Sequence, residues 1–218
     1  MTNQQQLSLE HQIRPSSESN APVIIMLHGY GSDENDLFSF SSELDERFFI
    51  VSARAPYPMF PFGHTWYTIH FEAPQGKWTD TEQALESRDK IAVFIDEVCE
   101  AYDVDSNRVI LLGFSQGTIL SIAVALTYPE KISDVVALSG YVNKDLIPTE
   151  INKDKISHLS FYCSHGTADQ VIPVDWARKT PAFFDGIGID YSYSEFPVGH
   201  GVAPQNFREF RDWLYKRY

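Results

Sequence analysis

The sequence predicts an α/β fold in which a mostly parallel central sheet is covered by helices on both faces. Short, continuous apolar runs at residues 23–27 and 109–112 are typical of strands that are buried on both faces. Segments with apolar residues at helical spacing alternate with such runs, which is the pattern of parallel strands joined by crossover helices. At 218 residues and 43% hydrophobic content, the chain can bury one large core. Because no repeat or low-complexity linker is visible, we expect one domain over residues 1–218, with residues 1–6 disordered.

The first half of the chain is expected to supply three strands and two helices. Leu7, Leu9 and Ile13 fall on odd positions, which indicates a short edge strand. Residues 79–82 have the S/T-x-x-E form of a capping box, and the helix that they open carries apolar residues three and four apart. In chain order, the expected elements are an edge strand, a buried strand, a helix, a strand and the capped helix, at residues 7–13, 23–27, 33–44, 48–53 and 79–102.

Residues 54–78 have no clean period and contain four prolines and seven aromatic side chains. A loop of this length inside a compact domain is usually functional, and its aromatic content argues against disorder. We expect the loop to lie near the functional site, with Trp66, Tyr67 and Phe71 contacting the substrate. The alternative is that these aromatic residues form a cluster that only holds the loop down.

The second half of the chain continues the alternation of strands and helices. Pro129 is expected to end the helix that begins at Gln116, and Pro181 is expected to break or kink the next one. The expected strands cover residues 109–112, 135–138, 159–163 and 191–196, and the expected helices cover residues 116–128, 174–184 and 205–215.

Composition and charge exclude several classes of protein. The formal net charge is -13 and the Lys and Arg residues are not clustered, so a nucleic-acid partner is not expected. The N-terminus has neither a basic nor an apolar signal region, and no apolar run reaches the length of a membrane span. We therefore expect a cytoplasmic protein without stable membrane insertion; the sequence leaves a homodimer open. Cys99 and Cys163, in a predicted helix and a predicted strand, are expected to be free thiols.

The residues from Gly113 to Gly117 form a G-x-S-x-G pentapeptide between a buried strand and a helix. This arrangement is typical of a nucleophile elbow, a sharp turn that lifts a serine hydroxyl above the edge of a parallel sheet. The two glycines are needed because a Cβ there would collide with the strand or helix that the turn brings close. Composition alone gives such a match only about 0.07 times in a chain of this length. The pattern therefore makes Ser115 the candidate nucleophile.

A serine nucleophile needs a base and an acid that orients the base, and in elbow enzymes these follow in the order acid, histidine. Among the downstream histidines, only His200 lies in a loop-like setting, between the last strand and the last helix. Asp169 follows a strand and is the favoured acid, because strand ends meet at the same edge of a parallel sheet. Asp175 is the competitor, although its place at the start of a helix suits a simple capping role.

The loop after the first buried strand, from His28 to Gly31, is expected to help stabilise an oxyanion. The donors would be the backbone N–H groups of Tyr30 and of Gln116, the residue after the nucleophile. A dinucleotide-binding loop is the rival interpretation, but Glu34 stands where the third glycine of that fingerprint belongs. No H-x-x-x-H, C-x-x-C or paired-acid spacing indicates a metal site.

These motifs resemble the phospholipase/carboxylesterase family of α/β-hydrolases, which includes the acyl-protein thioesterases. The resemblance rests on LHGYGS, GFSQG, HGTADQVIP and GHG, in that order, and extends from about residue 23 to residue 214. Two positions depart from the family pattern. Thr118 stands where a second glycine is usual after the pentapeptide, and Thr68 stands where an aspartate often follows the Trp-aromatic pair.

The resemblance implies an α/β-hydrolase fold, a Ser115–Asp169–His200 triad and no cofactor. It implies a serine hydrolase of the carboxylesterase, acyl thioesterase or lysophospholipase type. Such an enzyme would cleave small-molecule esters or thioesters with short to medium acyl chains through an acyl-enzyme on Ser115. The alternative function is a non-catalytic ligand-binding protein of the same fold, because a fold does not fix a function.

Overall fold

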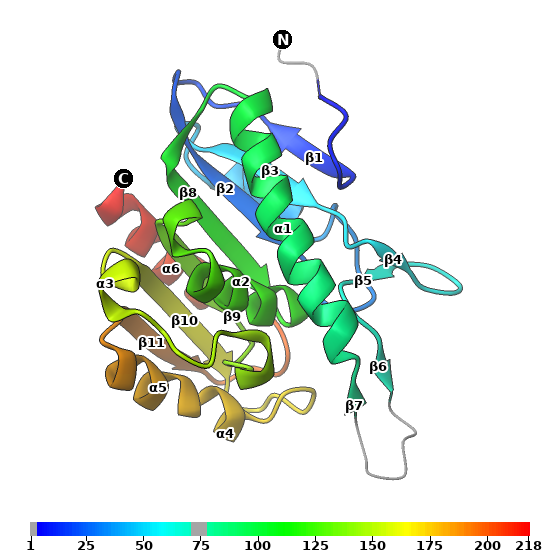
Figure 1. Ribbon diagram of the computed structural model, residues 1–218, viewed down its shortest axis with the longest axis vertical. Coiled ribbons are helices and arrows are strands. Elements are labelled where there is room, and N and C mark those ends of the chain that lie inside the picture. The colour runs from blue at the N-terminus through cyan, green and yellow to red at the C-terminus, as the bar shows by residue number, and fades with distance from the viewer. Residues whose placement is uncertain (1–3, 71–77) are drawn as a thin grey trace.

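A seven-stranded sheet forms the centre of the computed structural model, which describes residues 4–70 and 78–218 (Figure 1). The strand order is β1-β3-β2-β8-β9-β10-β11, and the only antiparallel pair in this sheet joins β1 to β3. The bounds of the strands are β1 (His11–Arg14), β2 (Ala21–Leu27), β3 (Phe49–Ala53), β8 (Val104–Phe114), β9 (Asp134–Leu138), β10 (Ser160–Gly166) and β11 (Asp190–Phe196). The predicted mostly parallel sheet is confirmed.

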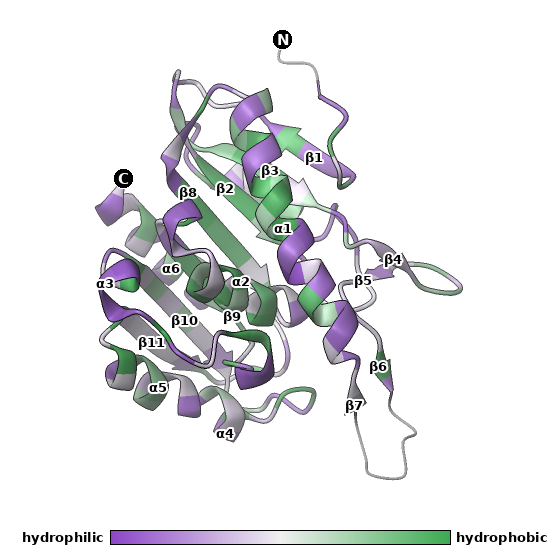
Figure 2. Cartoon of the chain, in the orientation of Figure 1, coloured by the Kyte–Doolittle hydropathy of each residue, from purple (hydrophilic) through white to green (hydrophobic). Residues whose placement is uncertain are grey.

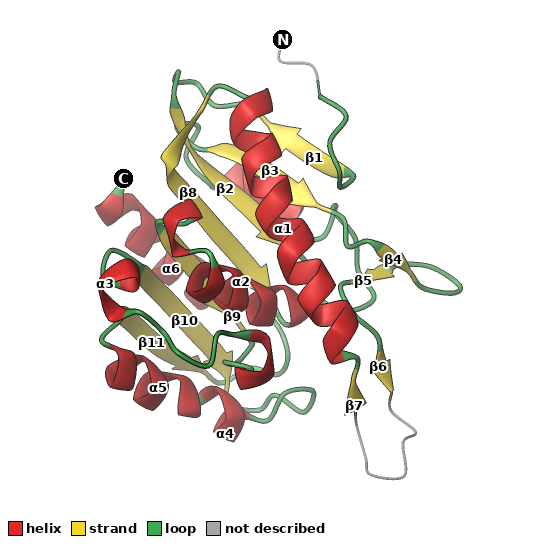
Figure 3. Cartoon of the chain, in the orientation of Figure 1, coloured by secondary structure: helices red, strands yellow, loops and turns green. Residues whose placement is uncertain are grey.

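Helices cover both faces of this sheet (Figure 3). Their bounds are η1 (Leu37–Glu43), α1 (Thr81–Ala101), α2 (Gln116–Thr127), η2 (Pro129–Lys131), η3 (Lys144–Leu146), α3 (Lys153–Ile156), α4 (Val174–Ala177), α5 (Lys179–Ile187) and α6 (Pro204–Arg217). Helices α1, α2 and α5 pack on one face, and η1 and α6 pack on the other. The helices on both faces are therefore also confirmed.

The alternation of side chains along β2 shows how the sheet divides the core into two layers. Val23, Ile25 and Leu27 belong to the hydrophobic cluster under α1 and α2, whereas Ile24 and Met26 belong to the cluster under α6. All five side chains are fully buried. Figure 2 shows β2 and the later part of β8 as hydrophobic, whereas the first residues of β8 are hydrophilic. A strand that is buried on both faces needs an unbroken apolar run, which is the pattern that the sequence shows.

Two predicted helices differ in the structure. The helix predicted over residues 33–44 is only a 3-10 helix, η1, and the Ser39 hydroxyl hydrogen-bonds to the carbonyl of Asp36 at 2.7 Å. Such local serine bonds compete with α-helical pairing. The break predicted at Pro181 lies instead at Arg178, between α4 and α5. Pro181 is tolerated in the first turn of α5, because its missing N–H would have no intrahelical acceptor there.

The predicted capping box is displaced by one residue. Asp80 is the N-cap of α1, and its carboxylate accepts a hydrogen bond from the backbone N–H of Gln83 at 3.0 Å. Thr79 instead ends the short strand β7 (Trp78–Thr79), so the threonine of the predicted box does not cap the helix. An aspartate and a threonine are both good N-caps, and the sequence pattern alone favoured the wrong one.

The predicted long loop is divided into two small hairpins, β4 (Tyr57–Pro58) with β5 (His64–Thr65) and β6 (Ile69–His70) with β7. Both extend away from the central sheet beside the lower end of α1 (Figure 1). Phe60 and Phe62, in the β4–β5 connection, are 100% and 81% exposed, so neither packs in a cluster that holds the loop down.

The disorder predicted for residues 1–6 stays a prediction. Residues 1–3 lie outside the described part of the chain, and the backbone N–H of Gln5 donates to the Tyr102 hydroxyl at 3.0 Å. Cys99 and Cys163 are free thiols, as predicted, and burial raises the pKa of Cys163 to about 12. Within the described residues, no helix is both long and apolar enough to cross a bilayer.

Candidate active site

Ser115 lies at the turn between β8 and α2 with φ 55° and ψ -114°. A positive φ is unfavourable for a residue with a Cβ, and it persists here because neighbouring backbone fixes the turn. A Cβ on Gly117 would lie 1.9 Å from the carbonyl oxygen of Leu27, and one on Gly113 would lie 2.5 Å from that of Gly117. Both glycines are therefore required by close backbone approach, as the elbow pattern predicts.

A chain of hydrogen bonds joins the three side chains that the sequence selected. His200 Nε2 lies 2.9 Å from Ser115 Oγ, and His200 Nδ1 lies 2.6 Å from Asp169 Oδ2. Because a carboxylate oxygen can only accept, the proton of neutral His200 is on Nδ1, and Nε2 is left free to accept the serine proton. The elbow, the loop after β10 and the loop after β11 each contribute one of these residues.

The Asp169 carboxylate is well supplied with donors. Its Oδ1 atom accepts from the backbone N–H groups of Val171 at 2.8 Å and Ile172 at 2.9 Å. Burial by itself raises the pKa of Asp169, but the hydrogen bonds from His200, Ile172 and Val171 outweigh it and hold this pKa below its usual value. The competing acid, Asp175, has a side chain that is 81% exposed and pairs with Arg178 at 3.2 Å. The geometry thus brings Asp169, and not Asp175, to the histidine.

His165 also contacts this carboxylate, which the sequence analysis did not anticipate. It lies at 1% exposure in β10, with Nε2 at 3.2 Å from Asp169 Oδ2 and at 2.9 Å from the carbonyl oxygen of Ile172. Since both oxygens are acceptors, the proton of neutral His165 is on Nε2. The sequence signals this contact only by the four-residue spacing between His165 and Asp169. The spacing does not reveal that the chain turns after the end of β10 and brings the Asp169 carboxylate back to His165.

Gln116 begins α2, where the first N–H groups of a helix have no intrahelical acceptor. Its side chain is buried and fixed by three bonds. Oε1 accepts from Trp66 N–H at 3.0 Å and from the Thr65 hydroxyl at 2.9 Å, and Nε2 donates to Tyr67 O at 2.7 Å. The elbow is therefore fastened to the long loop, and the backbone N–H of Gln116 is held beside Ser115.

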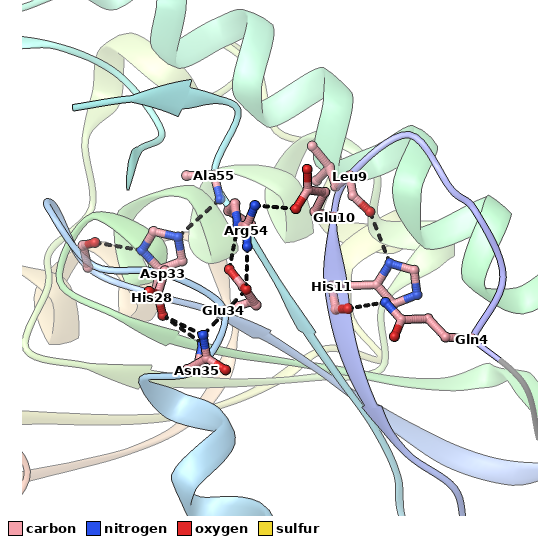
Figure 4. A network of polar contacts seen from close by, with 11 residues as sticks. Gln4, Leu9, Glu10, His11, His28, Asp33, Glu34, Asn35, Arg54 and Ala55 are labelled. Carbon is pink, nitrogen blue, oxygen red and sulfur yellow. Dashed lines mark hydrogen bonds and ion pairs between the residues drawn. The ribbon is translucent and has the colours of Figure 1, made fainter. Parts of the chain in front are cut away.

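A polar network contacts the chain on both sides of Tyr30, at His28 and at Glu34 (Figure 4). The Glu34 carboxylate forms a two-pronged ion pair with Arg54, with both N–O distances at 2.5 Å, and this pairing lowers the pKa of Glu34. His28 Nε2 accepts a hydrogen bond from the backbone N–H of Ala55 at 3.0 Å, and burial lowers the pKa of His28. Both contacts join the end of β3 to the candidate oxyanion loop.

A cavity of about 70 Å³ adjoins Ser115. Its walls come from the loop after β2, the predicted long loop with β7, the elbow with α2, and the segments after β9 and β10. The lining residues are Tyr30, Tyr67, Ile69, Thr79, Ser115, Gln116, Ile119, Tyr141, Val171, Ile172 and Trp176. Tyr67 lines this cavity, and its contact with a substrate stays a prediction; Phe71 lies outside the described residues. Tyr141 and Trp176 were not anticipated, because neither belongs to a motif.

The expectation for Trp66 requires correction. Its side chain is fully buried, its indole N–H donates to the carbonyl of His28 at 2.9 Å, and its ring lies 5.5 Å from the His28 ring. Trp66 is not part of the cavity wall. Trp66 packs in the core and joins the long loop to His28, and its indole N–H is satisfied there, as a buried tryptophan requires.

The structure explains the two departures from the family pattern. The Thr118 hydroxyl lies 2.7 Å from Gly113 O and 2.6 Å from Leu138 O, so it binds the elbow to the neighbouring strand β9. The backbone N–H and hydroxyl of Thr68 both donate to Gln83 Oε1 at 2.9 Å, which fixes the loop to α1. Among the described residues, no group of three or more His, Cys, Asp or Glu could hold a metal ion.

Comparisons with known proteins identify the family to which the chain is similar. A model of the phospholipase/carboxylesterase family matches residues 9–218. The chain is 30% identical over 180 residues to acyl-protein thioesterase 1 of Yarrowia lipolytica, covering 78% of each chain. It is 27% identical over 236 residues to acyl-protein thioesterase 1 of Cryptococcus neoformans var. neoformans serotype D, covering 95% of this chain and 97% of that one.

Solved structures share the fold. The carboxylesterase of Bacillus cereus superposes with a TM-score of 0.82 at 18% identity, covering 97% of this chain and 95% of that one. Acyl-protein thioesterase 2 of Zea mays superposes with a TM-score of 0.75 at 16% identity, covering 95% of this chain and 98% of that one. At these identities the likeness shows the fold alone, and it is the predicted α/β-hydrolase fold.

Proposed function

Because the chain belongs to the phospholipase/carboxylesterase family, we propose that it hydrolyses carboxylic esters and thioesters through an acyl-enzyme on Ser115. Its class is that of a carboxylic-ester hydrolase, in keeping with relatives named as thioesterases and carboxylesterases. The observation that carries the proposal is the chain of hydrogen bonds from Ser115 Oγ through the His200 ring to Asp169, at 2.9 and 2.6 Å.

Each group in the proposed reaction has one role. Ser115 Oγ attacks the acyl carbon while His200 Nε2 takes the serine proton. The negative charge that develops on the carbonyl oxygen is stabilised by the backbone N–H groups of Gln116 and Tyr30. Asp169 holds His200 in the tautomer that can accept at Nε2 and stabilises the imidazolium that forms.

The remaining steps return the enzyme to its starting state. The imidazolium of His200 donates its proton to the departing alcohol or thiol as the carbon–oxygen or carbon–sulfur bond breaks, which leaves the acyl group on Ser115. A water molecule then attacks the same carbon while His200 accepts its proton, and the carboxylic acid departs as Ser115 Oγ is reprotonated. No step requires a cofactor.

The cavity beside Ser115 supports an acyl group as the part of the substrate that is bound there. Apolar side chains of Ile69, Ile119 and Ile172 line it, and burying each CH₂ of an acyl chain against them contributes about 0.8 kcal/mol. We therefore propose that turnover rises from acetyl to butyryl and hexanoyl esters.

A fluorophosphonate probe tests the mechanism directly, because it reacts with an activated serine. Wild-type protein should be labelled at Ser115 and should hydrolyse a panel of acyl esters and thioesters of graded chain length. The Ser115→Ala variant should show neither labelling nor turnover and should keep the wild-type circular-dichroism spectrum. A folded wild-type protein that is never labelled and hydrolyses no member of the panel would indicate a non-catalytic ligand-binding protein.

A further inference from the structure

A second and much larger depression, of about 940 Å³, shares part of its wall with the cavity beside Ser115. Tyr141 and Trp176 line both, and their rings meet edge to face with centroids 5.2 Å apart at 75°. We call this depression the distal groove. It lies along α4 and α5, which cover the edge of the sheet near β11, and along the segment that follows β9 (Figure 1).

The distal groove continues the apolar surface of the smaller cavity. Beyond Tyr141 and Trp176, its wall includes the apolar side chains of Val142, Phe183 and Ile187. The cavity at Ser115 holds only about 70 Å³, so it buries the first part of an acyl chain, and the end of a hexanoyl or longer chain extends beyond it. Because Tyr141 and Trp176 belong to both spaces, a longer chain that leaves the first would pass these two rings and enter the second.

The charged side chains that line the distal groove are basic, although the protein is strongly acidic. Among the described residues that line it, the charged side chains are those of Lys144 and Lys179, whereas the whole chain has a net charge of -13. Lys144 Nζ lies 5.9 Å from the centroid of the Phe183 ring, which places an ammonium group over an apolar wall. One carboxylate, that of Asp145, lies close enough to the groove that its charge, after burial, contributes to raising the pKa of Tyr141.

The lining of the groove combines apolar side chains with two ammonium groups, whereas the described residues that line the cavity beside Ser115 include no lysine. This combination matches a chain that is apolar along its length and anionic at its end.

We propose that the distal groove binds the far end of an acyl chain that terminates in a carboxylate, so that monoesters of dicarboxylic acids are preferred substrates. This inference rests on the proposed hydrolase function and specifies its substrate class. The lysines supply the preference for an anion, since the overall charge of the protein would otherwise repel one. The carboxylate has its effect only when the chain is long enough to reach past Tyr141 and Trp176.

The test compares nitrophenyl monoesters of dicarboxylic acids, from butanedioic to decanedioic acid, with the same esters carrying a terminal carboxamide. The amide matches the carboxylate in shape but has no charge. After subtraction of the uncatalysed rate, kcat/KM should favour the carboxylate by roughly 3–10-fold for the longer chains, as two solvent-accessible charge contacts allow, and the preference should fall at high salt. The short butanedioic ester should show no such preference.

Charge reversal of both lysines provides the matched variant. The double variant Lys144→Glu/Lys179→Glu should prefer the amide, while its turnover of neutral acetyl ester stays at the wild-type level. The control Lys155→Glu/Lys216→Glu changes the net charge equally on exposed lysines that do not line the groove, and it should keep the wild-type preference. If the control lost its preference for the carboxylate over the amide ester as completely as the groove variant, the inference would be overturned. The net charge of the whole protein, and not the two groove lysines, would then determine the preference.

Two further outcomes separate this inference from the function on which it rests. Wild-type protein that hydrolyses the esters with no preference for carboxylate over amide at any chain length or salt concentration contradicts the groove assignment alone. Wild-type protein that hydrolyses none of the esters, charged or neutral, contradicts the hydrolase function, and the groove assignment falls with it.

Discussion

Replacing Asp169 by Asn should nearly abolish turnover, because the structure leaves the new amide no acceptable orientation. Asp169 Oδ1 accepts two backbone N–H groups, so the amide oxygen of Asn must occupy that position. Its NH₂ group would then face His200 Nδ1, which lies 2.6 Å from the present Oδ2, and His165 Nε2, which lies 3.2 Å away. In the wild-type protein both of these nitrogens carry a proton, so the NH₂ group of Asn would face two N–H donors.

The magnitude follows from the tautomer of the histidine. To avoid the clash, His200 must move its proton from Nδ1 to Nε2, and Nε2 then donates toward Ser115 Oγ and cannot accept the serine proton. The same exchange in a serine protease lowers kcat by about 10⁴-fold, which corresponds to about 5 kcal/mol of transition-state stabilisation. We expect a loss of that size in kcat for Asp169→Asn.

The assay is steady-state hydrolysis of a butyryl nitrophenyl ester, with Asp175→Asn as the matched control. Asp175 undergoes the same chemical change six positions later, but its carboxylate is 81% exposed and pairs with the half-exposed Arg178. Its variant should keep the wild-type kcat. Asp169 is not the acid if Asp175→Asn is the impaired enzyme, or if Asp169→Asn retains more than about a tenth of the activity while both variants remain folded.

Four further predictions follow from individual contacts. Ser115→Ala should lower kcat by at least about 10⁴-fold, because the nucleophile is removed, and its unfolding curve in urea should match that of wild type. A variant that keeps more than about a tenth of the wild-type activity would exclude Ser115 as the nucleophile. Glu34→Gln should lower kcat by roughly 10-fold with little change in KM, because the oxyanion loop loses its ion pair to Arg54, and an unchanged kcat would show that the loop does not need the pair. Because the pKa of Asp169 is lower in the folded than in the unfolded state, its ionised form stabilises the fold above the unfolded-state pKa, and this stabilisation is lost as the pH falls through the folded-state pKa. The free energies of unfolding of wild type and Asp169→Asn, measured by urea titration, should therefore converge at acidic pH. A constant difference between the two free energies at every pH would contradict this. Trp66→Ala should destabilise the fold by about 3–5 kcal/mol in urea unfolding and should lower turnover of all acyl chain lengths equally, whereas a selective loss of long chains would return Trp66 to the substrate-binding wall.

The sequence by itself predicted the parts of the molecule that depend on short-range chemistry. Residues 23–27 read as a strand buried on both faces because an unbroken apolar run leaves no side for water, and β2 is buried throughout. The G-x-S-x-G motif marked both elbow glycines, although only the approach of Gly113 to Gly117 lies within the turn, and Gly117 approaches Leu27 of the neighbouring strand β2. The order of Ser115, Asp169 and His200 selected three side chains that the fold then brings together, since each follows a strand of the same parallel sheet.

The tertiary structure decided everything that depends on partners far away along the chain. Trp66 lies behind the site because Gln116, 50 positions away, accepts a hydrogen bond from its backbone N–H, and no local pattern encodes that distance. The contact between His165 and Asp169, the capping of α1 by Asp80 and the break at Arg178 each depend on which of several locally acceptable conformations packs best. The distal groove arises only where α4, α5 and the segment after β9 meet, because a cavity is a property of surfaces that approach in space and not of residues that are neighbours in sequence.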